Sequence, residues 1–355
     1  MSIRRAVLRR VSALLLCAIM QGGSATAWGR EFATSAEPAQ DAVQHDARLG
    51  FVRAFSSPDE VERGHPVVGR TLDIILGPKA AEVRANSLHS PSGVTTDSSH
   101  RVFVADPGGN AVHVFDFVRG KYSRLEGAAG RPITPIALAV DAHDYLYVAD
   151  RSSRTVLIYD TAGKFSGYLG KLSGGESYFE TPASITIDRI TGRIYVSDTL
   201  RHMVIIMDEH GKLLDKIGKR GGGDQPGEFM LPGQMAVRDE ELFVIDVGNS
   251  RIQILDLAGH FRRAINLPYA DNRTGLAVDG QGNIYVSDPL LNQIQVFGHD
   301  GKSSYLFDPT TIESANFSHP LSMWVDAGYC LYVVDSANHR VGLFQISEPD
   351  GHECR

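Results

Sequence analysis

The sequence predicts an all-β fold, namely a six-bladed β-propeller of four-stranded blades whose ring is closed by an N-terminal strand. A pattern of strand, tight turn and strand recurs six times along the chain. The expected strands are rich in Val, Ile and Tyr, and Gly, Asp or Asn turns bound them. From Pro91 onward no segment has the periodicity of an amphipathic helix.

The second strand of each repeat ends in an aromatic-Val-x-Asp sequence or a close variant. These ends are residues 102–106, 146–150, 194–198, 242–246, 284–288 and 331–335. The closing aspartates lie 44, 48, 48, 42 and 47 residues apart, a spacing that holds four short strands. A third apolar strand follows in every repeat, and a weaker fourth follows in most. The repeat length is therefore that of a propeller blade.

The last repeat has no fourth strand of its own, because the chain ends soon after Gln345. A missing outer strand exposes unpaired backbone groups, which folded proteins avoid. Residues 51–55, Phe-Val-Arg-Ala-Phe, precede the first repeat and alternate as a strand does. We expect them to complete the last blade and so to hold the two ends of the ring together.

The N-terminus is expected to be a secretory signal peptide over residues 1–27. Four arginines, an apolar run at 11–20 and the small residues Ala25-Thr26-Ala27 follow one another in the order of such a signal. The run is too short to cross a bilayer stably, so we expect no transmembrane segment in the mature chain. Arg4-Arg5 is compatible with twin-arginine export, whereas the second arginine pair favours the general secretory route. Either route predicts a periplasmic or extracellular protein.

The remaining chain divides into four parts. Residues 28–50 have few large apolar side chains and are expected to be a disordered leader. Residues 51–90 hold the closing strand and a capping insertion, in which Leu72, Ile75 and Leu76 would share one face of a short helix or anchor a loop. Residues 91–346 form the propeller, and 347–355 form a C-terminal tail.

Charge and cysteine content narrow the possible partners. Without residues 1–27 the chain keeps 31 basic and 42 acidic side chains, a formal net charge of about −11. A surface of that sign repels phosphate backbones, so we expect no nucleic-acid partner. Two cysteines remain, Cys330 and Cys354, which either form one disulfide or stay free. We expect the mature chain to be a monomer.

Two segments resemble a known repeat family. Residues 335–341, Asp-Ser-Ala-Asn-His-Arg-Val, resemble the NHL signature, and residues 246–252, Asp-Val-Gly-Asn-Ser-Arg-Ile, nearly repeat it. The resemblance covers residues 91–345. The chain also looks like bacterial exported six-bladed NHL propellers, in which a Ser-Ser-Pro segment such as residues 56–58 precedes the first repeat. The resemblance implies a six-bladed ring.

Most repeated residues are expected to be structural. The strand-ending aspartates can accept hydrogen bonds from N–H groups of turns. We expect Arg154, Arg251 and Arg340 to pair locally with acids between blades. Three phenylalanines precede a proline by three residues and are expected to pack against the next blade; they are Phe179, Phe229 and Phe317. His202, His319 and His339 share no spacing and are expected in turns.

The inner strands offer little to a metal ion. Relatives that are amidating lyases carry zinc-binding histidines just after the repeat's proline. The matching residues here are Ser92, Ile136, Ala183, Gly233, Thr274 and Leu321. The next positions, where a calcium-dependent lactonase would need oxygen ligands, are Gly93, Ala137, Ser184, Gln234, Gly275 and Ser322. We therefore expect no metal, no cofactor and no catalytic residue, and the absence of a CxxCH motif excludes a covalent c-type haem.

The residues thus favour a non-catalytic binding scaffold for a protein, peptide or polysaccharide of the cell envelope. The expected partner face carries the turns after each aspartate and the connections into each proline. Its candidate residues are Arg151, Arg201, Lys219, Arg220, Tyr178 and Tyr269. Two alternatives stay open. One is a lyase- or lactonase-like enzyme with a metal in the central channel, and the other is an assembly factor for envelope machinery such as multi-haem cytochromes.

Overall fold

The computed structural model describes residues 49–61, 86–171, 174, 176–271, 274–302, 304–307, 309, 315–346 and 354. The expected signal peptide lies outside these residues, as do positions 28–48 of the expected leader and the expected capping helix. No helix of the described residues has the length and apolarity to cross a membrane.

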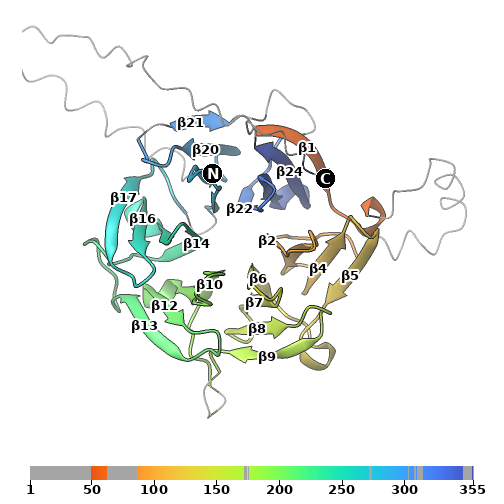
Figure 1. Ribbon diagram of the computed structural model, residues 1–355, viewed down its shortest axis with the longest axis horizontal. Helices are drawn as coiled ribbons and strands as arrows, with labels where there is room; N and C mark the ends of the chain where they lie inside the picture. Colours follow the sequence, from red (N-terminus) through yellow and green to blue (C-terminus); the bar gives the residue numbers. More distant parts are fainter. Residues whose placement is uncertain are drawn as a thin grey trace, which may run out of the picture. The chain divides into compact units, whose positions relative to one another are not determined.

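The predicted ring is confirmed, because six four-stranded antiparallel sheets surround a common centre (Figure 1). We number them as blades 1 to 6 in chain order. Blade 1 contains β2 (Gly93–Thr96), β3 (Val102–Asp106), β4 (Ala111–Asp116) and β5 (Lys121–Leu125). Blade 2 contains β6 (Pro135–Val140), β7 (Leu146–Asp150), β8 (Thr155–Tyr159) and β9 (Phe165–Leu169). Blade 3 contains β10 (Pro182–Ile187), β11 (Ile194–Asp198), β12 (Met203–Met207) and β13 (Leu213–Gly218).

The second half of the ring repeats this order. Blade 4 contains β14 (Pro232–Arg238), β15 (Glu241–Asp246), β16 (Arg251–Asp256) and β17 (Phe261–Asn266). Blade 5 contains β18 (Leu276–Val278), β19 (Ile284–Asp288), β20 (Gln293–Phe297) and β21 (Ser304–Phe307). Blade 6 contains β22 (Pro320–Val325), β23 (Cys330–Asp335), β24 (Arg340–Ile346) and, from the N-terminal side, β1 (Leu49–Phe55).

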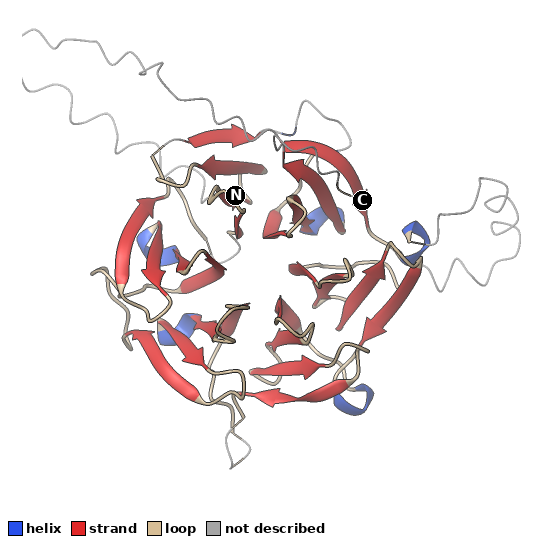
Figure 2. Cartoon of the chain, in the orientation of Figure 1, coloured by secondary structure: helices blue, strands red, loops and turns tan. Residues whose placement is uncertain are grey.

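Helical structure in the described residues is limited to short 3₁₀ turns between strands (Figure 2). They are η1 (Pro58–Glu60), η2 (Ala128–Gly130), η3 (Thr199–Arg201), η4 (Val247–Asn249) and η7 (Ser336–Asn338).

The hydrophobic core is divided among the blade interfaces. Each apolar cluster of buried residues joins two neighbouring blades, and the clusters run from the interface of blades 1 and 2 around to that of blades 6 and 1. The second strands supply much of it, since β3, β7, β11 and β23 are buried along their whole length. A strand covered on both faces favours β-branched and aromatic side chains over alternation, which explains sequences such as Ile-Tyr-Val-Ser-Asp in β11.

The predicted closing strand is confirmed. β1 pairs antiparallel with β24, from Leu49 opposite Ile346 to Phe55 opposite Val341. It begins two residues before its predicted start at Phe51, so the end of the expected leader belongs to the strand. The ring of Phe55 is 1% exposed and lies 5.0 Å from the ring of Phe115 in blade 1. β1 therefore completes blade 6 and also packs against its neighbour.

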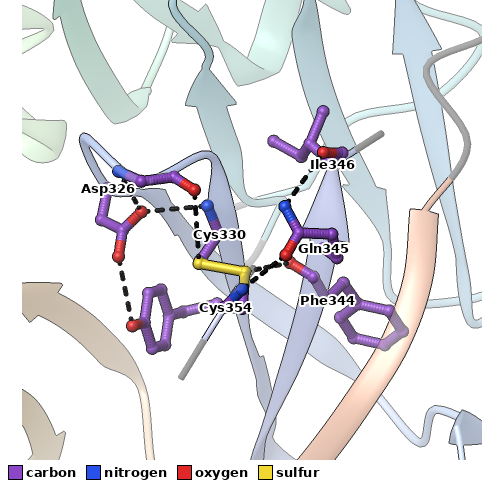
Figure 3. Close-up of a disulfide and its surroundings, with 8 residues drawn as sticks. Asp326, Cys330, Phe344, Gln345, Ile346 and Cys354 are labelled. Atoms are coloured by element: carbon purple, nitrogen blue, oxygen red, sulfur yellow. Dashed lines mark hydrogen bonds between the residues drawn. A yellow bond between two sulfur atoms is a disulfide. The ribbon is translucent and has the colours of Figure 1, made fainter. Parts of the chain in front are cut away.

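Blade 6 also holds the end of the chain. Cys330 of β23 forms a disulfide with Cys354, so of the two states left open by the sequence the structure shows the oxidised one (Figure 3). The backbone N–H of Cys354 also donates to the Gln345 side-chain oxygen on β24. The disulfide thus fastens Cys354 to the blade that β1 completes.

The predicted role of the strand-ending aspartates is confirmed. The buried carboxylate of Asp335 accepts hydrogen bonds from the backbone N–H of Ser318 (2.6 Å) and from the side chain of Asn338 (2.8 Å). It also accepts one from Nε of Arg340 (2.7 Å). The expected arginine pairing is wrong in one respect, because Arg340 pairs with the aspartate of its own blade and not with an acid between blades. Arg251 pairs in the same way with Asp246.

The predicted packing role of the three phenylalanines is also confirmed. Phe179, Phe229 and Phe317 are 1%, 0% and 7% exposed, and each belongs to the cluster between two blades. Burying one such side chain contributes about 2 kcal/mol. The expected turn positions of the histidines are confirmed too, since His202, His319 and His339 adopt left-handed backbone conformations at turns.

Candidate functional site

The inner strands of all six blades line a central channel, and the side chain of Gln234 crosses it. Gln234 lies on β14 of blade 4. Its amide nitrogen donates to the hydroxyl of Ser322 in blade 6 (2.8 Å), and its amide oxygen accepts from the backbone N–H of Leu276 in blade 5 (3.0 Å). One side chain thereby links three blades. Gln234 lies at one of the positions where a calcium-dependent lactonase of this shape would need an oxygen ligand.

The space left in the channel is small. The cavity has a volume of about 70 Å³, enough for a few water-sized groups. Pockets that enclose a drug-sized ligand have roughly 300–1,000 Å³. The channel as it stands therefore admits a small chemical group and not a whole substrate.

The polar groups of the inner strands bind the neighbouring strands. The Ser92 hydroxyl donates to the carbonyl of Ile136 (3.2 Å), and the Ser184 hydroxyl accepts from the backbone N–H of Met235 (3.2 Å). At Gly275 a Cβ would lie 1.8 Å from the carbonyl oxygen of Leu321, so blades 5 and 6 touch there through their backbones. Across the part of the chain that the structure describes, no three His, Cys, Asp or Glu side chains are grouped so as to hold a metal ion.

The ring has two distinct ends. We call connector face the end that carries the turns between second and third strands and the connections between blades. The opposite end, the hairpin face, carries the turns from first to second and from third to fourth strands. All the partner-face residues expected from the sequence lie on the connector face, in turns and connections of blades 2 to 5; they are Arg151, Tyr178, Arg201, Lys219, Arg220 and Tyr269.

Only some of these residues meet one another. The guanidinium carbon of Arg201 lies 5.5 Å from the centre of the Tyr178 ring, and Nζ of Lys216 lies 5.4 Å from it. Two cations on one ring form a cation–π cluster that fixes the tyrosine. Arg201 also lies 3.5 Å from Asp198, and Lys219 lies 2.7 Å from Glu228. The positive charges of Arg201 and Lys219 are therefore already paired with acidic side chains of the same protein.

The other candidates are exposed at the surface. Arg151 and Arg220 are exposed, and neither forms an ion pair with any described residue. Tyr269 is 38% exposed on the connection between blades 4 and 5. These residues lie on different blades, so a partner that contacts all of them must span an arc of the ring.

Sequence reasoning missed the apolar part of this face. Leu200, Leu290 and Leu291 are 56%, 57% and 65% exposed in the turns of blades 3 and 5. Leucines at turn positions that Gly, Ala, Asn, Ser or Arg occupy in the other blades were the available signal. Exposed leucines beside arginines and a tyrosine form a mixed surface of the kind that partners bind.

A family model described as a 6-bladed beta-propeller matches residues 179–295. The match runs from the connection before blade 3 to the third strand of blade 5, and its description agrees with the number of sheets in the structure. The chain is a six-bladed β-propeller. No curated protein matches the sequence.

Solved structures of similar propellers include enzymes. A streptogramin B lyase has a TM-score of 0.53 at 13% identity, over 73% of this chain and 94% of that chain. A gluconolactonase from Xanthomonas campestris has a TM-score of 0.55 at 17% identity, over 73% and 87%. A Bacteroides thetaiotaomicron protein of unknown function has a TM-score of 0.59 at 14% identity, over 75% and 71%. At these identities the likeness is one of fold, and the NHL resemblance stays a prediction.

Blade 1 of the propeller contains a buried polar chain that sequence reasoning also missed. Nε2 of His113 lies 3.3 Å from a carboxylate oxygen of Asp106, and Nδ1 of the same ring lies 2.8 Å from the Tyr122 hydroxyl. His113 and Asp106 are both 0% exposed. Burial raises the pKa of Tyr122 to about 12, so its hydroxyl stays protonated. His113 and Asp106 lie inside blade 1, whereas Tyr122 on the outer strand β5 is only partly buried.

Proposed function

We propose that this propeller is an exported, non-catalytic scaffold that binds a protein, peptide or polysaccharide of the cell envelope on its connector face. The observation that carries the proposal is the arc of exposed arginine, tyrosine and leucine side chains over blades 2 to 5. The rigid ring supports this arc, so a partner would meet a preorganised surface. The leucines favour a polypeptide partner over a polysaccharide.

The contents of the channel support a binding role over a catalytic one. The amide group of Gln234 is hydrogen-bonded to Leu276 in blade 5 and to Ser322 in blade 6, and the cavity beside it admits only a small group. A lyase or lactonase of this shape would need metal ligands that converge on the channel. Elemental analysis of the purified protein tests this point, and stoichiometric zinc or calcium would contradict the proposal.

The partner face is tested by charge reversal. Arg151→Glu and Arg220→Glu change exposed side chains that make no ion pair with described residues, so both variants should fold. Lys212→Glu is the matched control, because it reverses an exposed charge in a turn on the hairpin face. Each protein is immobilised and challenged with solubilised envelope fractions, and the affinity for any retained partner is then measured.

We expect the double variant Arg151→Glu/Arg220→Glu to bind the partner at least about ten-fold more weakly, while Lys212→Glu binds as the parent does. Equal retention by the three proteins would show that the connector face is not the binding surface. The identity of the partner decides the more specific possibility, an assembly factor for envelope machinery such as multi-haem cytochromes.

Export is a separate part of the proposal. It rests on the arginine-rich start, the short apolar run and the small residues before Trp28. N-terminal sequencing of the protein from its native host should give a chain that begins at Trp28. An intact Met1 in the cytoplasmic fraction would contradict export.

A further inference from the structure

Blade 4 breaks the repeat at the hairpin face. In the other five blades an aspartate directly follows the first strand and caps the turn to the second strand; these are Asp97, Asp141, Asp188, Asp279 and Asp326. In blade 4 the matching residue is Arg238. The turn after it, Asp239-Glu240, has only two residues, and both have positive φ angles (47° and 61°). Departures of this kind from local rules concentrate at functional sites.

The side chain of Arg238 reaches the mouth of the channel. It lines the central cavity, and its Nε is buried without a hydrogen-bond acceptor among the described residues. Its nearest acid, the Asp239 carboxylate, lies 3.9 Å from Nε and is 68% exposed. A buried N–H without an acceptor is unfavourable, so this guanidinium is suited to take an acceptor from outside.

Gly280 of blade 5 leaves room for this side chain. A Cβ at Gly280 would lie 2.6 Å from Nη2 of Arg238 and 2.6 Å from the Tyr329 hydroxyl of blade 6. The two polar groups therefore approach the same point, and a Cβ there would displace the end of one or both side chains. Together they form a cradle at the edge of the cavity.

A second arginine stands on the other side of this mouth. Arg189 comes from blade 3, and its Nε donates to the Val140 carbonyl (3.0 Å) while Nη2 donates to the Thr96 carbonyl (3.2 Å). Its guanidinium carbon lies 5.9 Å from the ring centre of Trp324, whose indole N–H donates to the Thr96 hydroxyl (2.9 Å). Arg189 is exposed, and a guanidinium has five N–H donors, so these two bonds leave others for a ligand.

Trp324 connects the two arginines, since it lines the same cavity as Arg238 and stacks near Arg189. At its position the other inner strands carry Thr95, Ala139, Thr186, Ala236 and Ala277. The mouth thus combines two cations and a large aromatic side chain in a protein whose formal net charge is −7.

We propose that this mouth, on the hairpin face, binds an oxyanion, the carboxylate or phosphate group of an acidic ligand. Guanidinium groups match both oxyanions in geometry and charge. The cavity of about 70 Å³ admits such a group, and the remainder of the ligand extends over Trp324 toward solvent. This inference concerns the end of the ring opposite the proposed partner face, so either can fail without the other.

Trp324 supplies the readout. The chain has two tryptophans, and a Trp28→Phe background leaves Trp324 as the only one. In that background, tryptophan fluorescence is titrated with sodium acetate and with sodium phosphate, and sodium chloride at equal ionic strength is the blank. We expect a saturable change with at least one oxyanion. Tighter binding of acetate assigns a carboxylate ligand, and tighter binding of phosphate assigns a phosphorylated one.

Variants locate the site. Arg238→Gln should weaken binding by about ten-fold or more, because it removes a charged donor. Gly280→Ala should also weaken it while every charge is kept, since the new Cβ displaces Nη2. Arg131→Gln, an exposed arginine on the connector face, is the matched control and should bind as the background does.

Thermal melting shows which variants are folded. If Arg238→Gln is not folded, the oxyanion affinity of Gly280→Ala tests the location of the site. A fluorescence change no larger than that with chloride would overturn the proposal. So would equal affinities in the background, Arg238→Gln and Gly280→Ala.

Discussion

Single buried carboxylates hold the connections between blades in place. Asp335 illustrates this, since it binds the backbone of the preceding connection and two side chains of its own turn. Asp288 of blade 5 is only partly buried, and among the described residues it accepts from the N–H groups of Leu290 and Leu291 in its own exposed turn. The repeated aspartate is therefore not equally buried around the ring.

The first prediction compares these two residues. Asp335→Ala removes the buried carboxylate that accepts from Nε of Arg340 and from the Ser318 N–H, and should lower the free energy of unfolding by about 3–5 kcal/mol. Asp288→Ala should lower it by about 1 kcal/mol or less. Urea denaturation followed by circular dichroism measures both. Similar losses for the two variants would mean that burial of the aspartate is not what matters.

Asp106 makes the stability of blade 1 dependent on pH. Burial by itself raises the pKa of its carboxyl, but the nearby His113 side chain and hydrogen bonds from the backbone N–H groups of His89 and Ser90 outweigh burial and lower the pKa to about 2. A carboxyl whose pKa is lower in the folded state stabilises the protein above its unfolded pKa of about 4. That stabilisation is lost as the pH falls toward 2.

The second prediction follows from this sign. Between about pH 4 and pH 2 the parent should lose roughly 2 kcal/mol through Asp106 alone. Asp106→Asn has no charge to lose at this position, so its stability should fall less over the same interval. Urea midpoints measured from pH 5 to pH 2 compare the two proteins, and parallel curves would refute the assignment.

Sequence reasoning succeeded at residues that repeat and failed at residues that do not. The aspartates were interpreted correctly because six copies in one strand position point to a shared structural need. Arg238 and Trp324 each replace the residue type found in the other blades, and His113 lies at a position where the residue varies from blade to blade. Their significance depends on what surrounds them in space, and no spacing along the chain contains that information.

At the scale of the element, β1 is the first described strand of the chain, and it pairs with β24, the last strand. Its existence was predictable, because a blade with three strands leaves an edge unpaired. Its start at Leu49 was not, since a polar leader and a strand differ little over the two residues Leu49-Gly50. The contact of Phe55 with Phe115 in blade 1 was also unforeseeable, as it arises only when the ring closes.

The third prediction concerns this strand. Deleting residues 51–55 uncovers β24 and removes Phe55 from its cluster, so the melting temperature should fall by about 10 °C or more. A milder pair of variants isolates the packing. Phe55→Ala should cost about 3–5 kcal/mol, whereas Val52→Ala, at a position 40% exposed, should cost well under about 1 kcal/mol. An unchanged melt after the deletion would remove β1 from the account of ring closure.

The fourth prediction concerns the disulfide of blade 6. Cys330 and Cys354 are 24 residues apart, and closing a loop of that length restricts the unfolded chain by about 3 kcal/mol. Reduction, or Cys354→Ser, should lower the free energy of unfolding by roughly that amount. Urea curves with and without reductant measure it. A coincident pair of curves would show that the bond adds nothing to the stability of the ring.

At the scale of the whole molecule, the six blades make a closed core with two ends that carry different sets of loops. The channel between them is bridged by Gln234 and keeps only a small cavity. The connector face carries exposed leucines and arginines, and the hairpin face carries the two-arginine mouth beside Trp324. This division follows from strand order, because each blade directs its connections to one end and its hairpins to the other.

The fold was predictable at this scale and the surfaces were only partly so. Six copies of one repeat determine the number of blades, and the strand-ending aspartates determine which end carries the connections. Side-chain exposure depends on how the loops pack against one another. The sequence therefore located Arg151 and Tyr269 on the connector face but could not show that Arg201 and Lys219 are already paired.

The most direct test of the account is to map where a partner touches the ring. A photoreactive amino acid is placed at Leu291, 65% exposed on the connector face, and in a second protein at Leu214, 47% exposed on the outer strand β13. After irradiation in envelope fractions, we expect a discrete crosslinked product from position 291 and none from position 214. Products of equal yield from both positions, or a product from 214 alone, would contradict a partner bound on the connector face.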